Sequence, residues 1–231
     1  GGVGLNCSMN SRVLQDSPFE SVFVQPSAHD AGTALGAAYY IYNTMLGNDR
    51  NFVINHAYYG PEYSDEEIKA ELDLDKLKYT HHRDIAKKCA ELINDGKIIG
   101  WFQGRAEWGP RALGNRSILA NATSSEMQDI VNKYVKHRED FRPFAPAVLK
   151  ESSRDFFDFD HESPFMLFIC DVKPEKRKLI PAVTHTDGTA RVQTVDQKYN
   201  KLFYDVIKKF GEISGIPIVL NTSFNVAGEP V

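Results

Sequence analysis

The stretch KIIGWFQGRAEWGPRALGNRSILA, residues 97–120, contains the strongest indication of the fold. Its first part, residues 97–102, is apolar and predicts a buried strand, and a loop rich in glycine and arginine follows directly. Glycine allows close approach of the backbone to a ligand, and the arginine fork matches phosphate or carboxylate oxygens. We interpret residues 104–117 as an oxyanion-binding loop. The alternative is a surface loop with solvated arginines, which the apolar flanks disfavour.

Helical and strand patterns alternate on both sides of this loop. Ser64-Asp65-Glu66-Glu67 predicts a capping box, and Asp84 predicts the cap of a helix that buries Ile85, Cys89, Leu92 and Ile93 and ends at Gly96. A third helix from Ser124 is expected to bury Ile130, Val131, Tyr134 and Val135. Further helices are expected over 31–42 and 198–210, and further strands over 21–25, 144–149, 164–172, 190–195 and 216–220. The pattern predicts an α/β fold with a mixed sheet.

Composition excludes several classes of protein. The chain has 231 residues, of which 42% are hydrophobic and 25% charged, and its net charge is -4. This composition is typical of a globular protein and gives no sign of disorder or of general nucleic-acid binding. No apolar run approaches the length of a membrane span, and three scattered cysteines fit a reducing cytoplasm better than a disulfide framework.

The two ends of the sequence suggest a piece of a longer protein. The chain lacks an initiator Met and starts with GGVGLN, which is typical of a glycine turn inside a fold. A polar stretch with several glycines and a proline separates two patterned regions. We therefore expect a remnant of one domain at 1–46, a linker at 47–62 and a second domain at 63–231.

A basic cluster, KHREDFRPF (136–144), lies where a predicted helix gives way to a strand. Pro143 ends the helix and favours an extended conformation at Arg142. Lys136 and Arg142 are therefore candidates for contact with a polyphosphate. Spacing alone favours the alternative, a helix end with ion pairs to Glu139 and Asp140.

Three weaker signals lie elsewhere. His185 and Arg191 flank an Asp-Gly turn, and a single loop histidine is more often structural than catalytic. Asn221 and Ser223 follow an apolar run and suit hydrogen bonding to a ligand, although an Asx or Ser turn explains them equally well. Asp30 lies at a strand-to-helix turn and is a candidate metal ligand whose partners would have to come from elsewhere.

Together these segments resemble the O-carbamoyltransferases of nodulation and antibiotic biosynthesis. The resemblance lies, in the order of that family and over nearly the whole chain, in GGVGLNC (1–7), QPSAHDAGTALGAA (25–38), GRAEWGPRALGNRSILA (104–120), NKYVKHREDFRPFAPAVL (132–149), PAVTHTDGTARVQTV (181–195) and IPIVLNTSFNVAGEP (216–230).

The resemblance implies two domains and a two-stage reaction. It implies that 1–46 is the C-terminal remnant of an actin/Hsp70-type ATPase-like domain and that 63–231 is a YrdC-like domain. The second domain would form carbamoyl-adenylate from carbamoyl phosphate and ATP with Mg²⁺. The first, which holds iron in the family, would pass the carbamoyl group to a hydroxyl of a small acceptor. We expect no nucleic-acid or membrane partner, and the oligomeric state stays open.

The resemblance also implies roles for individual residues. Those matching contacts of the nucleotide and the carbamoyl-adenylate are Arg111, Lys136, Arg142, Arg191, Asn221 and Ser223, of which Lys136, Arg142 and Arg191 are the expected catalytic cations. Asp30 matches the metal-binding aspartate, with its partner ligands upstream. Two alternatives stay open: an enzyme that makes threonylcarbamoyl-adenylate for tRNA, and a non-catalytic nucleotide- or RNA-binding module.

Overall fold

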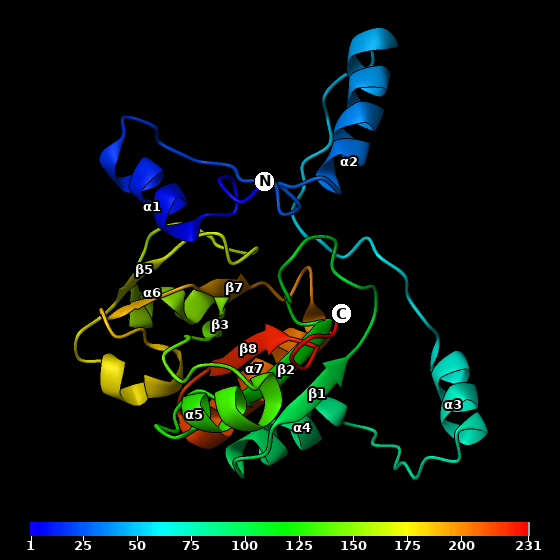
Figure 1. The fold of residues 1–231 in the computed structure, drawn as a ribbon, viewed down its shortest axis with the longest axis vertical. Helices are drawn as coiled ribbons and strands as arrows, with labels where there is room; N and C mark the ends of the chain where they lie inside the picture. Colours follow the sequence, from blue (N-terminus) through cyan, green and yellow to red (C-terminus); the bar gives the residue numbers. More distant parts are fainter. Residues whose placement is uncertain (231) are drawn as a thin grey trace.

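A five-stranded sheet forms the centre of the molecule. The computed structural model describes residues 1–230, and its main sheet has the strand order β1-β2-β8-β3-β7 (Figure 1). The strands are β1 (Ile99–Phe102), β2 (Arg116–Asn121), β3 (Ala145–Leu149), β7 (Gln193–Val195) and β8 (Ile218–Ser223). Strands β3 and β7 run parallel, whereas the other three pairings are antiparallel. The predicted mixed sheet is therefore confirmed.

Helices α4 (Ile85–Asn94) and α7 (Lys201–Ser214) cover one face of this sheet (Figure 1). Alternate residues of the strands face them, so that Leu119 and Val219 pack against Ile93 and Phe203 in one apolar cluster. This period of two is the usual consequence of the strand pleat. Burial of these side chains is the main favourable contribution to folding on this face.

The other face of the sheet is covered by α5 (Met127–Val131) and by a small second sheet. That sheet has the order β4-β5-β6 and consists of β4 (Phe157–Asp158), β5 (Cys170–Val172) and β6 (Thr189–Ala190), with α6 (Ser153–Phe156) ahead of it. Ile218 and Leu220 of β8 point to this side, among Met127 and Phe157. The central strand β8 is therefore buried on both faces.

The predicted helix caps are confirmed. Ser64 and Glu67 form the capping box of α3 (Asp65–Leu74), and the Asp84 carboxylate accepts a 3.0 Å hydrogen bond from the backbone N–H of Lys87. The Asn200 side chain caps α7 in the same way, accepting from Phe203 at 3.2 Å. These side chains satisfy backbone donors that the first helical turn leaves free.

The N-terminal segment lies across the body of the molecule. Helix α1 (Cys7–Asp16) is held there because Asn10 donates to the carbonyl of Leu167 at 3.1 Å and Ser11 accepts from the N–H of Ile169 at 2.7 Å. In contrast, α2 (Gly32–Tyr39), its π-helical continuation (Tyr40–Met45) and α3 bury no residue and project outward (Figure 1). No helix within residues 1–230 is long and apolar enough to cross a membrane.

Three strand predictions are corrected by the fold. Residues 21–25 form no strand, because they pair with no sheet edge, and Phe23 is 65% exposed. Of residues 164–172 only Cys170–Val172 is a strand, since Met166 has a left-handed backbone (φ +54) that interrupts the run. Residues 190–195 divide at Arg191 between β6 and β7, which belong to different sheets.

Two expected core residues lie outside the core. Ile85 is 42% exposed at the start of α4, and Tyr134 is 65% exposed. Tyr134 turns outward because the helix after Val131 continues as a π-helix (Asn132–Lys136), which changes the angular spacing of its side chains. The same change buries Asn132 and Lys136, which the regular helical pattern places opposite Val131.

Glycine is required where the arginine-rich loop meets α7. Gly114 has φ +106, and a Cβ atom there would lie 2.2 Å from the ring of Phe203. We expect Gly114→Ala to lower the free energy of unfolding by roughly 2 kcal/mol or more, because overpacking adds to the strain of a positive φ. Urea denaturation measures the change.

The matched control is Gly47→Ala, at φ +70 with nothing within 4 Å of the added Cβ. Backbone strain alone should cost about 1 kcal/mol there. Equal losses for the two variants would contradict the packing role of Gly114.

Candidate functional site

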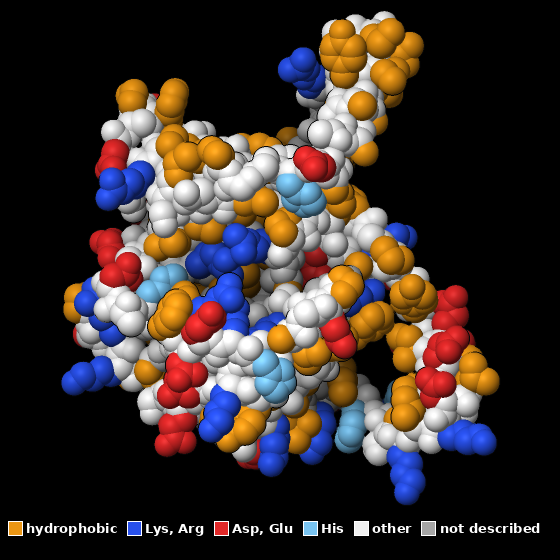
Figure 2. All heavy atoms as spheres, in the orientation of Figure 1, with side chains coloured by type: hydrophobic (Ala, Val, Ile, Leu, Met, Phe, Trp, Pro, Cys, Tyr) orange, Lys and Arg blue, Asp and Glu red, His pale blue; other side chains and the backbone are white. Residues whose placement is uncertain are grey.

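A cavity of 460 Å³ lies between the N-terminal segment and the main sheet. Its walls come from residues 5–8, the loop at 110–112, the segment 138–145 and β8. Figure 2 shows Lys and Arg side chains gathered in the hollow on this face. Within residues 1–230, four arginines and no Asp or Glu line this arginine cavity: Arg111, Arg138, Arg142 and Arg191.

The arginine-rich loop is held by a carboxylate that the sequence pattern does not single out. Glu107 Oε1 accepts hydrogen bonds from the N–H groups of Leu113 at 2.7 Å, Asn115 at 2.8 Å and Arg116 at 3.2 Å. Arg116 itself donates to the carbonyls of Gln103 and Gly104, at 2.7 and 3.1 Å. Such charge-assisted bonds fix a loop firmly.

The three arginines expected to bind an oxyanion in this loop therefore have different roles. Arg116 is buried and bonds to backbone carbonyls, and Arg105 pairs with Glu62 at 3.4 Å on the surface. Only Arg111 lines the cavity. The glycines of this loop were expected to let the backbone approach a ligand, but two of them pack against protein. Gly114 lies against Phe203, and Gly109 lies against the backbone of Pro26.

Arg111 and Arg191 meet in the wall of the cavity without an acidic partner. The Nε atoms of both are buried with no hydrogen-bond partner, and Arg111 Nη2 reaches only the Cys7 sulfur, at 3.9 Å. Burial, and secondly the like charge of Arg111, lower the pKa of Arg191 to about 10. An anion in the cavity would relieve this repulsion.

Arg138, which the sequence analysis did not select, stands beside Arg142. Arg138 Nε donates to Asn132 Oδ1 at 2.7 Å, and its guanidinium lies 4.7 Å from the centre of the Phe144 ring. Arg142 reaches Glu139 at 3.7 Å, so part of the ion-paired helix end exists. That pair is exposed and weak, because its side chains retain 53% and 61% of their surface. The one sequence signal that could have indicated Arg138 as a site residue is its position between Lys136 and Arg142 in residues 136–144.

Lys136 lies behind the arginine cavity and bonds to protein. It borders an adjoining hollow that also contains Arg138, Arg142 and Ser223. Its Nζ donates to the carbonyls of Ser223 and Asn225, both at 2.7 Å, and to their side-chain oxygens at 3.0 and 3.1 Å. Lys136 thus fixes the end of β8 with the whole of its donor capacity.

Burial gives Lys136 an unusual titration. Desolvation, and secondly the nearby Arg138, lower the pKa of Lys136 to about 8, against 10.5 for a free lysine. The unfolded chain therefore binds more protons between these two values, and the folded state gains stability as pH rises through this window.

We expect the free energy of unfolding of the wild type to rise relative to Lys136→Met between about pH 8 and pH 10. Urea denaturation at a series of pH values measures the difference. Lys133→Met, which removes an exposed lysine three residues away, should show no such trend. A difference that stays constant or falls over this range would contradict the lowered pKa.

Asn221 and Ser223, two of the predicted contact residues, lie on strand β8 and line the same cavity as the arginines. Asn221 Nδ2 donates to the carbonyl of Ala112 at 3.2 Å and to Gln193 Oε1 at 2.9 Å, while its Oδ1 is buried without a partner. Ser223 Oγ accepts from Lys136 and donates to Asn225 Oδ1 at 2.5 Å. The structure thus places five of the six predicted contact residues on one cavity, with Lys136 directly behind.

His185 also lines the cavity, although the sequence predicts a structural role for it. The expected turn is present, because the Gly188 N–H donates to the His185 carbonyl at 2.9 Å. Its ring bonds through Nδ1 to Thr189 Oγ1 at 3.0 Å. Burial lowers the pKa of His185. The charge of Asp187 raises this pKa and that of Arg191 lowers it, so the net shift favours the neutral ring.

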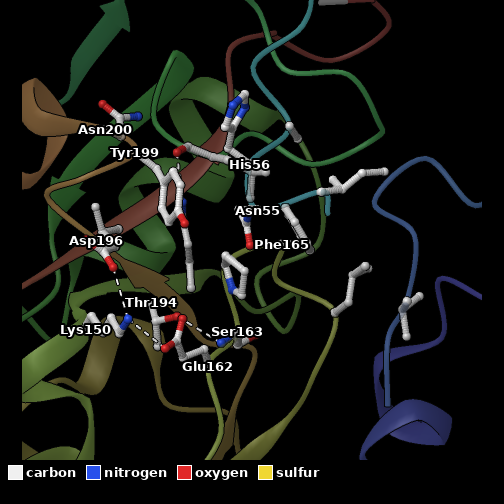
Figure 3. A pocket seen from close by; sticks show the side chains of 18 of the residues that line it. Asn55, His56, Lys150, Glu162, Ser163, Phe165, Thr194, Asp196, Tyr199 and Asn200 are labelled. Carbon is white, nitrogen blue, oxygen red and sulfur yellow. Dashed lines mark hydrogen bonds and ion pairs between the residues drawn. The ribbon is translucent and has the colours of Figure 1, made fainter. Parts of the chain in front are cut away.

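A second cavity, of 540 Å³, contains both positive and negative side chains (Figure 3). Lys150 pairs there with Glu162 at 2.7 Å and with Asp196 at 3.0 Å, and aromatic rings including His56 and Tyr199 form another wall. Its charges therefore compensate one another. The arginine cavity, whose charges do not, is the candidate functional site.

The residues present do not by themselves form a metal site. Residues 1–230 contain no group of three or more His, Cys, Asp or Glu side chains arranged to hold a metal ion. Asp30 is exposed two residues before α2, and His29 beside it contacts Ser27 Oγ at 3.2 Å. Asp30 as an iron ligand stays a prediction, and we derive no step through a metal.

A cavity lined by four arginines and, within residues 1–230, by no Asp or Glu suits an anionic ligand. Comparison with known proteins specifies the class. The family model for the carbamoyltransferase C-terminus matches residues 90–231, and that for the carbamoyltransferase N-terminus matches residues 1–39. The chain belongs to the carbamoyltransferase family. The predicted domain boundaries stay a prediction.

Curated relatives align along the whole chain. Nodulation protein NolNO of Sinorhizobium fredii is 46% identical over 237 residues, which are 100% of this chain and 35% of the relative. The 3'-hydroxymethylcephem-O-carbamoyltransferase of Streptomyces clavuligerus is 38% identical over 99% of this chain and 42% of its own length. Nodulation protein U of Rhizobium fredii is 37% identical over 99% of this chain and 38% of its own length. The chain thus spans about two fifths of the relatives it matches.

Proposed function

We propose that this chain forms carbamoyl-adenylate for an O-carbamoyltransferase, using carbamoyl phosphate and ATP. The observation that supports this most directly is the arginine cavity, in which four guanidinium groups face no carboxylate and two Nε atoms lack partners. Phosphate oxygens are the acceptors that guanidinium forks match best. Membership of the carbamoyltransferase family supplies the group that is transferred.

The proposed chemistry has three steps. Water cleaves carbamoyl phosphate to carbamate and inorganic phosphate. A carbamate oxygen then attacks the α-phosphorus of ATP, so that one P–O bond forms, another breaks, and pyrophosphate leaves. Finally an acceptor hydroxyl attacks the carbonyl carbon of carbamoyl-adenylate, AMP leaves, and the hydroxyl proton passes to solvent or to a base. Mg²⁺ would enter as part of the ATP substrate and would offset part of the phosphate charge.

The residues of the cavity suit the second step. Arg111, Arg191 and Arg142 stabilise negative charge as it gathers on the phosphate oxygens. Arg111 and Arg191 are partly buried, whereas Arg142 is exposed and can move toward the ligand. Lys136 acts from behind by holding Ser223 in place. We assign Ser223 a binding role, since its hydroxyl accepts from the Lys136 ammonium and donates its proton to the Asn225 amide oxygen, which is too weak a base to make it a nucleophile.

The finer architecture belongs to the same proposal. We infer a YrdC-like domain for residues 63–231 and the end of an ATPase-like domain for residues 1–46, with the acceptor and iron bound mainly by that first domain of the full protein. The relative from Streptomyces clavuligerus is named for O-carbamoyl transfer to 3'-hydroxymethylcephem, which supports a small hydroxylated acceptor here. A cytoplasmic location fits the need for ATP and carbamoyl phosphate.

The test is carbamoyl-phosphate-dependent exchange of labelled pyrophosphate into ATP by the 231-residue chain. We expect Arg191→Gln to lower the exchange rate about 100-fold, because it removes a preorganised charge from the reacting phosphate. Arg154→Gln is the matched control, since Arg154 is exposed and pairs with Asp160 outside the cavity.

Exchange that is absent from both the chain and its full-length protein would overturn the proposal. So would exchange that requires bicarbonate and threonine in place of carbamoyl phosphate. ATP binding that survives Arg191→Gln unchanged, without turnover in the parent, would indicate a non-catalytic nucleotide-binding module.

A further inference from the structure

A short chain of hydrogen bonds leads from an exposed carboxylate to the wall of the arginine cavity. Asp187 Oδ1 accepts from the Thr189 hydroxyl at 2.7 Å and from the Thr189 N–H at 3.0 Å. Thr189 Oγ1 in turn lies 3.0 Å from Nδ1 of His185, which lines the cavity. The backbone holds the same turn, because the His185 N–H donates to the Thr189 carbonyl at 2.8 Å. Three side chains are therefore joined in one line.

The order of donors in this line fixes the tautomer of His185. Hydrogen bonds from Thr189 lower the pKa of Asp187, so that its carboxylate is ionised near pH 7 and can only accept. The carboxylate takes the single hydroxyl proton of Thr189, and Thr189 Oγ1 must then accept from His185. The imidazole proton is therefore on Nδ1, and Nε2 has a free lone pair.

This lone pair is accessible. His185 Nε2 makes no hydrogen bond within residues 1–230, and it is not one of the buried polar atoms that lack a partner. It is therefore open to solvent, and the arginine cavity is the hollow that His185 borders. No Asp or Glu of residues 1–230 lines this cavity, and its guanidinium groups offer only donors. Among the described lining residues, His185 alone offers a neutral nitrogen base near pH 7.

The charges around His185 favour this neutral form. Asp187 lies on the same turn, Arg177 places its guanidinium beside Gly188, and Arg191 faces the ring with the other cavity arginines. Burial is the largest cause of the lowered pKa of His185, and Arg191 adds to it against Asp187. The pKa thus lies below the ordinary 6.5, which leaves the base unprotonated near pH 7.

We propose that His185 Nε2 is the general base for cleavage of carbamoyl phosphate by water, with Thr189 and Asp187 as positioning residues. This assignment rests on the proposed function and concerns its first step. The water oxygen bonds to phosphorus while one of its protons passes to Nε2. The bond between phosphorus and the carbamoyl oxygen breaks, and its electron pair leaves with carbamate. The imidazolium then releases the proton to solvent.

The arginines bring the phosphorus to this base. Arg191 borders the same cavity and lies close enough for its charge to lower the pKa of His185, so a phosphate bound by Arg191 lies near Nε2. Guanidinium groups offset the charge of the phosphate oxygens, and a positioned base directs the attacking water. A general base of this kind contributes about 10²–10⁴-fold to a rate.

A supply of carbamate separates the first step from the second. Ammonium carbamate in solution provides carbamate directly, so that exchange of labelled pyrophosphate into ATP no longer needs the cleavage step. In His185→Asn the amide N–H can still bond to Thr189, whereas the base is lost. We expect the exchange rate of the 231-residue chain with carbamoyl phosphate to fall about 100-fold in this variant. The rate with ammonium carbamate should stay within about twofold of the wild type, which also reports that the variant is folded.

Two further measurements test the line of hydrogen bonds and the direction of attack. Thr189→Val removes the acceptor of Nδ1–H and should lower the rate with carbamoyl phosphate about tenfold, and Thr189→Ser should restore it. The wild-type rate should fall below pH 6.5, where Nε2 gains a proton and loses its lone pair, and His185→Asn should lack this fall. In water labelled with ¹⁸O, the label should enter inorganic phosphate.

His81→Asn is the matched control, since His81 is exposed and lies outside the cavity, and both exchange rates should stay unchanged. Loss of both rates in His185→Asn, or of neither, would overturn the role of His185 while leaving the proposed function intact. Label in carbamate in place of phosphate, or a wild type that uses ammonium carbamate alone, would overturn the proposed cleavage. Absence of exchange from the wild type with either donor would overturn the proposed function itself.

Discussion

Uncompensated positive charge is the constraint on which the candidate site depends. Arg111 and Arg191 are held together with no carboxylate lining their cavity, and this arrangement costs free energy that the rest of the fold must supply. The two apolar clusters on either face of the sheet do so, since they fix the strands whose ends form the cavity. The repulsion is thereby preserved for an anion to relieve.

Polar residues behind the cavity convert this packing into a defined geometry. Glu107 gathers three backbone N–H groups of the arginine-rich loop, and Lys136 gathers four oxygens at the end of β8. Neither side chain lines the arginine cavity. These charged groups satisfy backbone atoms outside the cavity, whereas Arg111 and Arg191 in its wall have no acidic partner among residues 1–230. Rigid support of this kind is expected of a preorganised binding site.

Local signals predicted much of the fold because they depend on neighbours in the chain. The predicted caps at Ser64 and Asp84 join residues three positions apart, and the mixed sheet follows from short apolar runs. Predictions failed where a distant partner decides. Residues 21–25 are apolar enough for a strand but meet no sheet edge, and residues 190–195 divide between two sheets. Tyr134 faces solvent because a π-helix replaced the expected α-helix.

The sequence by itself determined the class of fold, the family resemblance and the candidate site residues, since motifs and their order are properties of the chain. Only the tertiary structure decided what those residues do. It directed Arg116 to backbone carbonyls and Arg111 to the cavity, although both come from one loop. It also placed Cys7 beside Arg111, 104 residues away, and added Arg138 to the site. The reason is physical: whether an arginine is free depends on which acceptors surround it, and those come from segments remote in the sequence.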